Sequence, residues 1–235
     1  CGVPVFQRRF QQRPCSGGNA GGWRCAVSVD AGHVAVRQRA GELLFREDFS
    51  EGWKERWEIT GGEWNAAEGV LDGLYRGNAG GLIYTWEQFP GNIIMDFYGK
   101  MIAPCNNDLN FSFRAKGWDN QKGDAALGYI AGLNGWWKKR AGIERYPECA
   151  LYAMNGTFVA ESDREYHIQT GIVDDMSFIL VDGELVVLLC DPSPIDEEGA
   201  CRVGLGTYCS HVQFRDLKIY RAEHRTVQLS YTPNF

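Results

Sequence analysis

Residues 176–189 read Met-Ser-Phe-Ile-Leu-Val-Asp-Gly-Glu-Leu-Val-Val-Leu-Leu, two apolar runs on either side of an Asp-Gly pair. Asp-Gly is a strong signal for a two-residue hairpin turn, because both residues accept the positive φ angles that such a turn requires. The stretch therefore predicts two antiparallel strands, at 176–181 and 184–189. Residues 109–114 predict another strand, in which Leu109, Phe111 and Phe113 alternate with polar residues and so mark a buried face.

Segments of strand length recur along the chain from residue 42 onward, with glycine-rich turns between them. Further strands are expected at 43–49, 57–59, 63–65, 69–73, 81–84, 91–100, 126–133, 150–154, 166–173, 203–208 and 212–220. In the last of these, two apolar pairs are out of phase across Arg215-Asp216, which predicts a β-bulge. No long amphipathic helix and no internal repeat is visible. This pattern predicts an all-β jelly-roll sandwich of two antiparallel sheets.

The two ends of the chain differ from this pattern. Residues 1–40 hold six arginines, no lysine and one acid, Asp30, and show little sustained periodicity. We expect them to form a poorly ordered or atypical N-terminal extension, with a functional basic tail as the alternative. The sandwich itself is expected to span residues 41–222, and residues 223–235 to form a C-terminal tail.

Composition narrows the classes of function. The formal net charge of −6 argues against a nucleic-acid binder, which would present a basic face. No apolar run has the length of a transmembrane helix, so no membrane span is expected. The eight cysteines form no Cys-x-x-Cys pair, which argues against a zinc ribbon. Small buried thiols in a reducing cytoplasm are favoured over the disulfides of a secreted protein.

Motifs near both ends of the predicted sandwich resemble a known superfamily. They are Glu-Asp-Phe-Ser at 47–50, Gly-Glu-Trp at 62–64, Glu-Gly-Val-Leu-Asp-Gly at 68–73, and the segments 178–186, 202–206 and 212–220. They resemble concanavalin A-like lectin/glucanase domains, including the laminin-G-like and 3-keto-disaccharide hydrolase-like groups. Residues 107–111 and 135–144 look closest to the YesU-like hydrolases. The resemblance covers about residues 43–221 and implies a concanavalin-like jelly-roll sandwich that handles carbohydrate.

The chemistry implied by this resemblance is less specific than the fold. Glycoside hydrolases of family sixteen share the fold and carry Glu-x-Asp-x-x-Glu on one strand, a spacing that this chain lacks. The two carboxylates of a standard retaining glycosidase are therefore not visible as a motif. The chain also lacks a Gly-x-Ser-x-Gly elbow, a P-loop and a dinucleotide fingerprint, which disfavours serine-nucleophile, NTP and NAD chemistry.

Candidate sugar-binding residues gather in the middle of the chain. Sugar recognition needs an aromatic face for the C–H side of a pyranose and planar polar groups for its hydroxyls. A glycine-flanked Trp-Trp-Lys sequence supplies both, and the polar face of strand 109–114 is expected to line the same cleft. The predicted substrate-binding residues are Trp136, Trp137, Tyr129, Asn110, Arg114, Lys138, Trp118 and Tyr152. The alternative is that the indoles cap the core and the polar residues face solvent.

Acid–base candidates are few. Glu144 is the first candidate and His167 the second. Strand alternation is expected to point His167, with Glu165 and Gln169, into the same cleft, where Glu144 or Glu165 would be its acid–base partner. A histidine on a strand is more often a structural group. We expect no cofactor and no functional metal. A structural calcium ion, to which Asp48 or Asp216 would contribute, is the alternative.

Three functions remain open at this point. The first is a carbohydrate-active protein that binds polysaccharide fragments in a cleft on a concave sheet and cleaves them by hydrolysis or elimination. The second is a non-catalytic carbohydrate-binding module, which the missing family-sixteen motif supports. The third is a laminin-G-like protein-interaction domain. An oligo- or polysaccharide is the expected partner for the first two.

Overall fold

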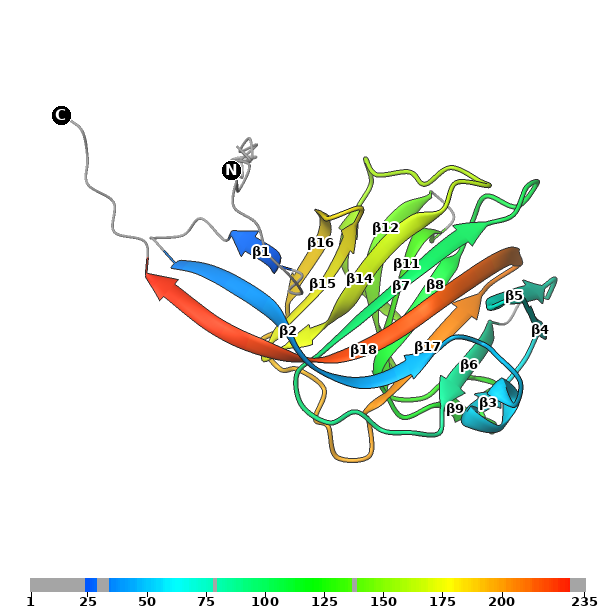
Figure 1. Ribbon diagram of the computed structural model, residues 1–235, viewed down its shortest axis with the longest axis horizontal. Helices are drawn as coiled ribbons and strands as arrows, with labels where there is room; N and C mark the ends of the chain where they lie inside the picture. The colour runs from blue at the N-terminus through cyan, green and yellow to red at the C-terminus, as the bar shows by residue number, and fades with distance from the viewer. Residues whose placement is uncertain (1–23, 29–33, 78–79, 137–138, 229–235) are drawn as a thin grey trace.

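A computed structural model of the chain describes residues 24–28, 34–77, 80–136 and 139–228. Trp137 and Lys138, two of the predicted substrate-binding residues, lie outside the described residues. The described elements are β-strands, apart from one short 3-10 turn, η1 (Trp53–Arg56) (Figure 1). None of the described elements is a helix long and apolar enough to cross a membrane.

Two large antiparallel sheets form the fold, which confirms the predicted all-β sandwich (Figure 1). The first sheet has the order β1 (Arg24–Ser28), β2 (Val34–Glu47), β18 (Ser210–Gln228), β7 (Ile93–Met101), β14 (Tyr166–Val173), β15 (Met176–Val181) and β16 (Glu184–Cys190). A hairpin of β4 (Glu63–Ala67) and β5 (Val70–Tyr75) joins this sheet, because β5 also pairs with β18. The second sheet has the order β13 (Ala150–Asn155), β12 (Arg140–Tyr146), β11 (Gly128–Gly135), β8 (Leu109–Ala115), β17 (Arg202–Thr207), β6 (Gly81–Thr85) and β3 (Trp57–Ile59). A separate hairpin consists of β9 (Trp118–Asp119) and β10 (Asp124–Ala125).

The hydrophobic core lies between the two sheets. Phe97 of β7 meets Phe111 of β8 edge to face, with ring centroids 5.4 Å apart. Leu109, Phe111 and Phe113 are fully buried, as their alternation along the strand predicts. Each aromatic ring buried in this way stabilises the fold by about 1.5–3 kcal/mol. The same alternation turns Asn110 of β8 toward the outer face of the second sheet.

The predicted hairpin and bulge are both present. Val181 of β15 pairs with Glu184 of β16, and Asp182 and Gly183 between them have φ angles of 53° and 84°. In β18 the register shifts beyond Arg215, at the point where the bulge was expected. These features follow from local sequence because the turn and the bulge each need backbone angles that few residue types accept.

Strands β2 and β18 extend beyond the residue boundaries expected for the sandwich. β2 begins at Val34, before residue 41, and β18 continues to Gln228, after residue 222. Val34 and Gln228 are register partners at the far end of this pair. Figure 1 shows the two strands continuing together past β7, β14, β15 and β16 of the first sheet.

Candidate functional site

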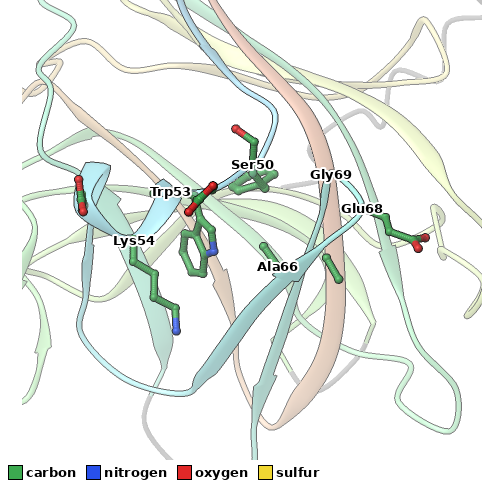
Figure 2. Close-up of a pocket in the computed structure, with 11 residues that line it drawn as sticks. Ser50, Trp53, Lys54, Ala66, Glu68 and Gly69 are labelled. Carbon is green, nitrogen blue, oxygen red and sulfur yellow. The ribbon is translucent and has the colours of Figure 1, made fainter.

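A hollow at the edge of the sandwich is the first place to consider. It measures about 640 Å³ and lies between η1 and the β4–β5 hairpin. Figure 2 shows its labelled polar side chains, Ser50, Lys54 and Glu68, pointing in different directions. Trp53 in its wall is 6% exposed and belongs to the core. Because a binding site needs polar groups that converge on a small apolar surface, this hollow is not our candidate.

Glycines form a row across the outer face of the second sheet. Gly142, Gly132 and Gly206 are in register with Asn110 of β8. A Cβ atom at Gly132 would stand 2.3 Å from the Asn110 Oδ1 atom, and one at Gly206 would stand 2.4 Å from Leu82 Cδ2. The absence of these side chains therefore lets neighbouring side chains lie flat against the sheet.

Trp136 packs against this face at the end of β11. Its indole Cζ3 atom comes within 3.1 Å of the place where a Cβ of Gly142 would stand. The residue is only partly buried, so part of its surface stays accessible to a ligand. Trp136 also hydrogen-bonds the Glu144 carboxyl, which lowers the pKa of that group.

Glu144 stands beside Trp136 on β12. Its neighbour Ile143 is fully buried in the core, so strand alternation directs Glu144 to the outer face. Burial raises the pKa of Glu144 despite hydrogen bonds from Trp136 and Cys149, and the negative charge of Asp124 raises it further. The Cys149 Sγ atom lies 3.4 Å from Glu144 Oε1. A partly desolvated carboxyl with a raised pKa is typical of a functional site.

A second carboxyl, Asp108, lies at the start of β8. Its Oδ1 atom is 3.1 Å from the position that a Cβ of Gly135 would take. Burial raises the pKa of Asp108 to about 6, against hydrogen bonds from Asn107 and Asn110, and the charge of Glu144 adds to the rise. The Asn107 Nδ2 atom donates to Asp108 Oδ2 at 2.9 Å. We call the cluster of Asp108, Asn110, Trp136, Glu144 and Cys149 the Trp136 site.

The β9–β10 hairpin covers another part of the same sheet face. Trp118 of β9 and Ala125 of β10 pack there against Tyr84, Ile130 and Tyr146. Tyr84 is 1% exposed beneath this cover, whereas the residues of the Trp136 site keep partly or fully exposed surface. The Trp118 ring, predicted to bind substrate, therefore serves at least to hold the hairpin on the sheet.

Tyr129 and Arg114 do not reach the outer face, contrary to expectation. Tyr129 is fully buried and its hydroxyl donates to Asp191 Oδ2 at 2.7 Å. Arg114 has a φ of 48° at a register shift between β8 and β17, and this bulge breaks the alternation. Its guanidinium donates to the carbonyl oxygens of Gly91 at 3.2 Å and Ile195 at 3.4 Å.

Tyr152 lies on the edge strand β13, away from the Trp136 site. The side chain is 44% exposed, and the guanidinium of Arg145 is 5.8 Å from its ring centroid. Arg145 pairs with Asp191 at 2.9 Å and follows Glu144 on β12, so it points to the opposite face of the strand. Tyr152 therefore lies near Arg145 and is not part of the Trp136 site.

His167 is on the other side of the molecule from Glu144. It belongs to β14 of the first sheet, where its neighbours Tyr166 and Ile168 are buried in the core. The side chain therefore points outward from the first sheet, and its Nε2 atom lies 3.0 Å from Asp96 Oδ1. This hydrogen bond raises the pKa of His167. The predicted Glu144–His167 pair is wrong, because the two strands belong to opposite layers.

Metal ligands do not gather in the described part of the chain. No group of three His, Cys, Asp or Glu side chains there lies close enough to hold an ion. The two expected calcium ligands have other partners. The Lys218 ammonium lies 2.6 Å from Asp216 Oδ2, where a cation would bind, and Asp48 accepts the backbone N–H of Ser50 at 3.0 Å.

Two members of the Trp136 site, Asp108 and Cys149, were not predicted as site residues from the sequence. Asp108 had a signal, because it directly precedes the alternating strand and begins the face on which Asn110 lies. Cys149 had none, since only the β12–β13 turn returns it to Glu144.

Comparison with known proteins supports the fold. No protein-family model and no curated protein matches the sequence. A Bacillus subtilis protein of unknown function with a galectin-like fold is 14% identical and superposes with a TM-score of 0.65, over 80% of this chain and 100% of its own. The carbohydrate-binding module CBM66 from B. subtilis is 17% identical, with a TM-score of 0.57 over 70% of this chain and 95% of its own.

A third solved structure is the exoplasmic/lumenal domain of VIP36 in its Ca²⁺/Man3GlcNAc-bound form. It is 11% identical, with a TM-score of 0.55 over 82% of this chain and 93% of its own. At such identities the likeness establishes the fold alone. The chain has the galectin-like, concanavalin-like β-sandwich fold.

Proposed function

We propose that the chain binds an oligo- or polysaccharide at the Trp136 site. The observation that carries this proposal is the partly buried Trp136 side chain beside the Glu144 carboxyl, on the sheet face that also bears the Asn110 amide. A pyranose has an apolar C–H face that stacks on an aromatic ring, and hydroxyls around its rim that bond to planar polar groups. The site offers both kinds of contact on one face of a rigid sheet.

Two further observations support the proposal. The segments that carry the YesU-like resemblance, 107–111 and 135–144, are the segments that build the site. Placement of the chain near the YesU-like hydrolases is therefore part of the proposal. In addition, two proteins with this fold are named as a carbohydrate-binding module and a domain with a bound glycan.

Cleavage of the bound glycan is the second part of the proposal, with Glu144 as an acid–base group. Burial raises its pKa, as is common for carboxyls that exchange protons with a substrate. A non-catalytic module would bind the same glycans without turnover, and a protein-interaction domain would not bind them. These outcomes separate the three functions in one experiment that measures both binding and products.

The binding test uses two thiols of the chain itself. Cys149 is exposed inside the Trp136 site, and Cys190 is exposed on β16 of the first sheet. Oligosaccharides that bind on a glycan array should slow alkylation of Cys149 and leave that of Cys190 unchanged, as read from peptide masses. Equal protection of both thiols, or of neither, would count against the site.

A pair of aromatic variants locates the contact. Trp136→Ala should lower the affinity for the bound oligosaccharide about tenfold, which corresponds to about 1.4 kcal/mol. Tyr152→Ala removes another accessible aromatic ring at the sheet edge and should leave the affinity unchanged. The proposal fails if the two variants behave alike, or if no glycan on a broad array binds the wild-type chain.

A further inference from the structure

We infer that Asp108 is the proton donor that works with Glu144 to hydrolyse a glycosidic bond at the Trp136 site. This inference rests on the proposed function and adds a catalytic residue and a reaction to it. Both carboxyls adjoin Trp136, and a buried amide anchors the segments that carry Asp108 and Trp136.

Asp108 and Glu144 both lie next to Trp136. The Asp108 Oδ1 atom lies 3.1 Å from the position that a Cβ of Gly135 would take, and Gly135 directly precedes Trp136. Trp136 packs over Gly142 and hydrogen-bonds Glu144. The charge of Glu144 acts on Asp108, so the two carboxyls are also near each other. A sugar ring bound at the indole would therefore meet a pair of carboxyls, and acid–base cleavage of a glycosidic bond uses such a pair.

Strained backbone marks the same segments. Asp108, Asn134 and Trp136 have φ angles of 55°, 58° and 57°, in the left-handed region. Side chains other than glycine occupy this region at a cost of about 1–3 kcal/mol each, and do so mostly where function requires it. Three such residues at the ends of two paired strands, β8 and β11, indicate that this geometry is imposed by the surrounding structure.

Asn134 holds the strained segments together. It is 1% exposed, and its Nδ2 atom donates to the carbonyl of Asn106 at 3.0 Å and to that of Ala160 at 2.7 Å. Its Oδ1 atom accepts the backbone N–H of Ala160 at 2.8 Å. Asn134 therefore ties the segment before Asp108 to the segment that carries Trp136. Such a buried anchor is what keeps catalytic groups in position.

The titration behaviour agrees with this division of roles. A pKa of about 6 keeps about half of Asp108 protonated at pH ~6 and about a tenth at pH ~7, so a general acid is present in this range. The Glu144 carboxylate takes the other role and accepts a proton. Both groups are shifted chiefly by burial, and the negative charge of Glu144 favours the protonated form of Asp108.

The reaction consumes one water. The bond between the anomeric carbon and the glycosidic oxygen breaks, its electron pair goes to that oxygen, and the oxygen takes the proton of Asp108. The oxygen of a water molecule bonds to the anomeric carbon and gives its proton to the Glu144 carboxylate. The products are two sugars with a hydroxyl at each new end, and exchange of protons with solvent restores both carboxyls.

The test compares leaving groups. On a panel of polysaccharides and methylphenyl glycosides, Asp108→Asn should lower turnover by about 10²–10⁴-fold, since the leaving oxygen then lacks its proton. On dinitrophenyl glycosides, whose leaving group departs without a proton, the same variant should keep most of its activity. Glu144→Gln should lose activity on both kinds of substrate, and Glu198→Gln, at an exposed residue, on neither.

The outcomes distinguish the role of Asp108, the hydrolysis and the proposed glycan binding. Equal losses on both leaving groups by a folded Asp108→Asn variant, as shown by circular dichroism, would overturn its role as proton donor. No turnover of any substrate by the wild type, with Cys149 still protected by oligosaccharide, would overturn the hydrolysis and leave the proposed binding intact. Absence of that protection would overturn the proposed function itself.

Discussion

Asp108 should lower the stability of the fold at neutral pH, and its removal should therefore stabilise the protein. Burial raises the pKa of its carboxyl from 3.8 to about 6. The native state consequently holds a proton that the unfolded chain has lost between these two values. In this range stability falls as pH rises, and above pH ~6 the full cost of burying the charge remains. The variant Asp108→Asn is neutral at every pH and has no such cost.

The size of the effect follows from the two pKa values. A difference of one pKa unit corresponds to about 1.4 kcal/mol, so the rise to about 6 corresponds to about 3 kcal/mol. An amide keeps one acceptor where the carboxylate has two, so a hydrogen bond from Asn107 or Asn110 is weakened at a cost of about 1 kcal/mol. The expected net gain at pH 8 is about 2 kcal/mol, or about 5 °C in Tm for a chain of this length.

Urea unfolding and thermal melts at pH 4 and pH 8 would measure this difference. At pH 4 the carboxyl is largely protonated in the native state, so the variant should gain nothing there. Glu198→Gln removes the same charge from an exposed position and controls for the change in net charge. The reasoning is refuted if Asp108→Asn is less stable than wild type at pH 8, or if its effect is the same at both pH values.

Three other outcomes can be measured with the same methods. Glu47→Gln should cost about 3–5 kcal/mol in urea unfolding, because the fully buried Glu47 carboxylate accepts two N–H groups of the Arg56 guanidinium, each at 2.8 Å. Gly132→Ala should push the Asn110 amide aside and weaken glycan binding in titration calorimetry, whereas Gly156→Ala, with nothing within 4 Å of its Cβ, should not. The pKa of His167 is raised, so its contribution to stability is complete below pH ~6.5 and is lost as pH rises through the higher native value. His167→Gln should remove that dependence without affecting glycan binding, and reduced binding would contradict the placement of His167 on the far sheet.

Much of the fold could be predicted from local sequence. The strand at Tyr166–Val173 and the β15–β16 hairpin are signalled by short-range patterns: apolar alternation and an Asp-Gly turn. The β12 strand, by contrast, was not among the expected strands. Its glycines and charged residues hide the alternation, and pairing with β11 on one side and β13 on the other stabilises it as a strand.

Local sequence patterns predict the candidate site only in part. Trp136, Asn110 and Glu144 could be selected by residue type, because sugar binding needs an aromatic ring and planar polar groups. Sequence could not tell which sheet each strand joins, so His167 was paired with a residue on the opposite face of the molecule. It also could not anticipate the bulge that turns Arg114 inward, since a β-bulge re-aims the side chain at the residue where it occurs.

By itself, therefore, the sequence determined the strand content, the turns and the residue types available for a site, because these depend on neighbours within a few positions. Only the tertiary structure decided that Asp108 and Glu144 both adjoin Trp136, and that Tyr129 is enclosed in the core. Those outcomes depend on register between strands distant in the chain and on which layer each strand enters. Burial, and with it the pKa of each carboxyl, exists only after the two sheets have packed together.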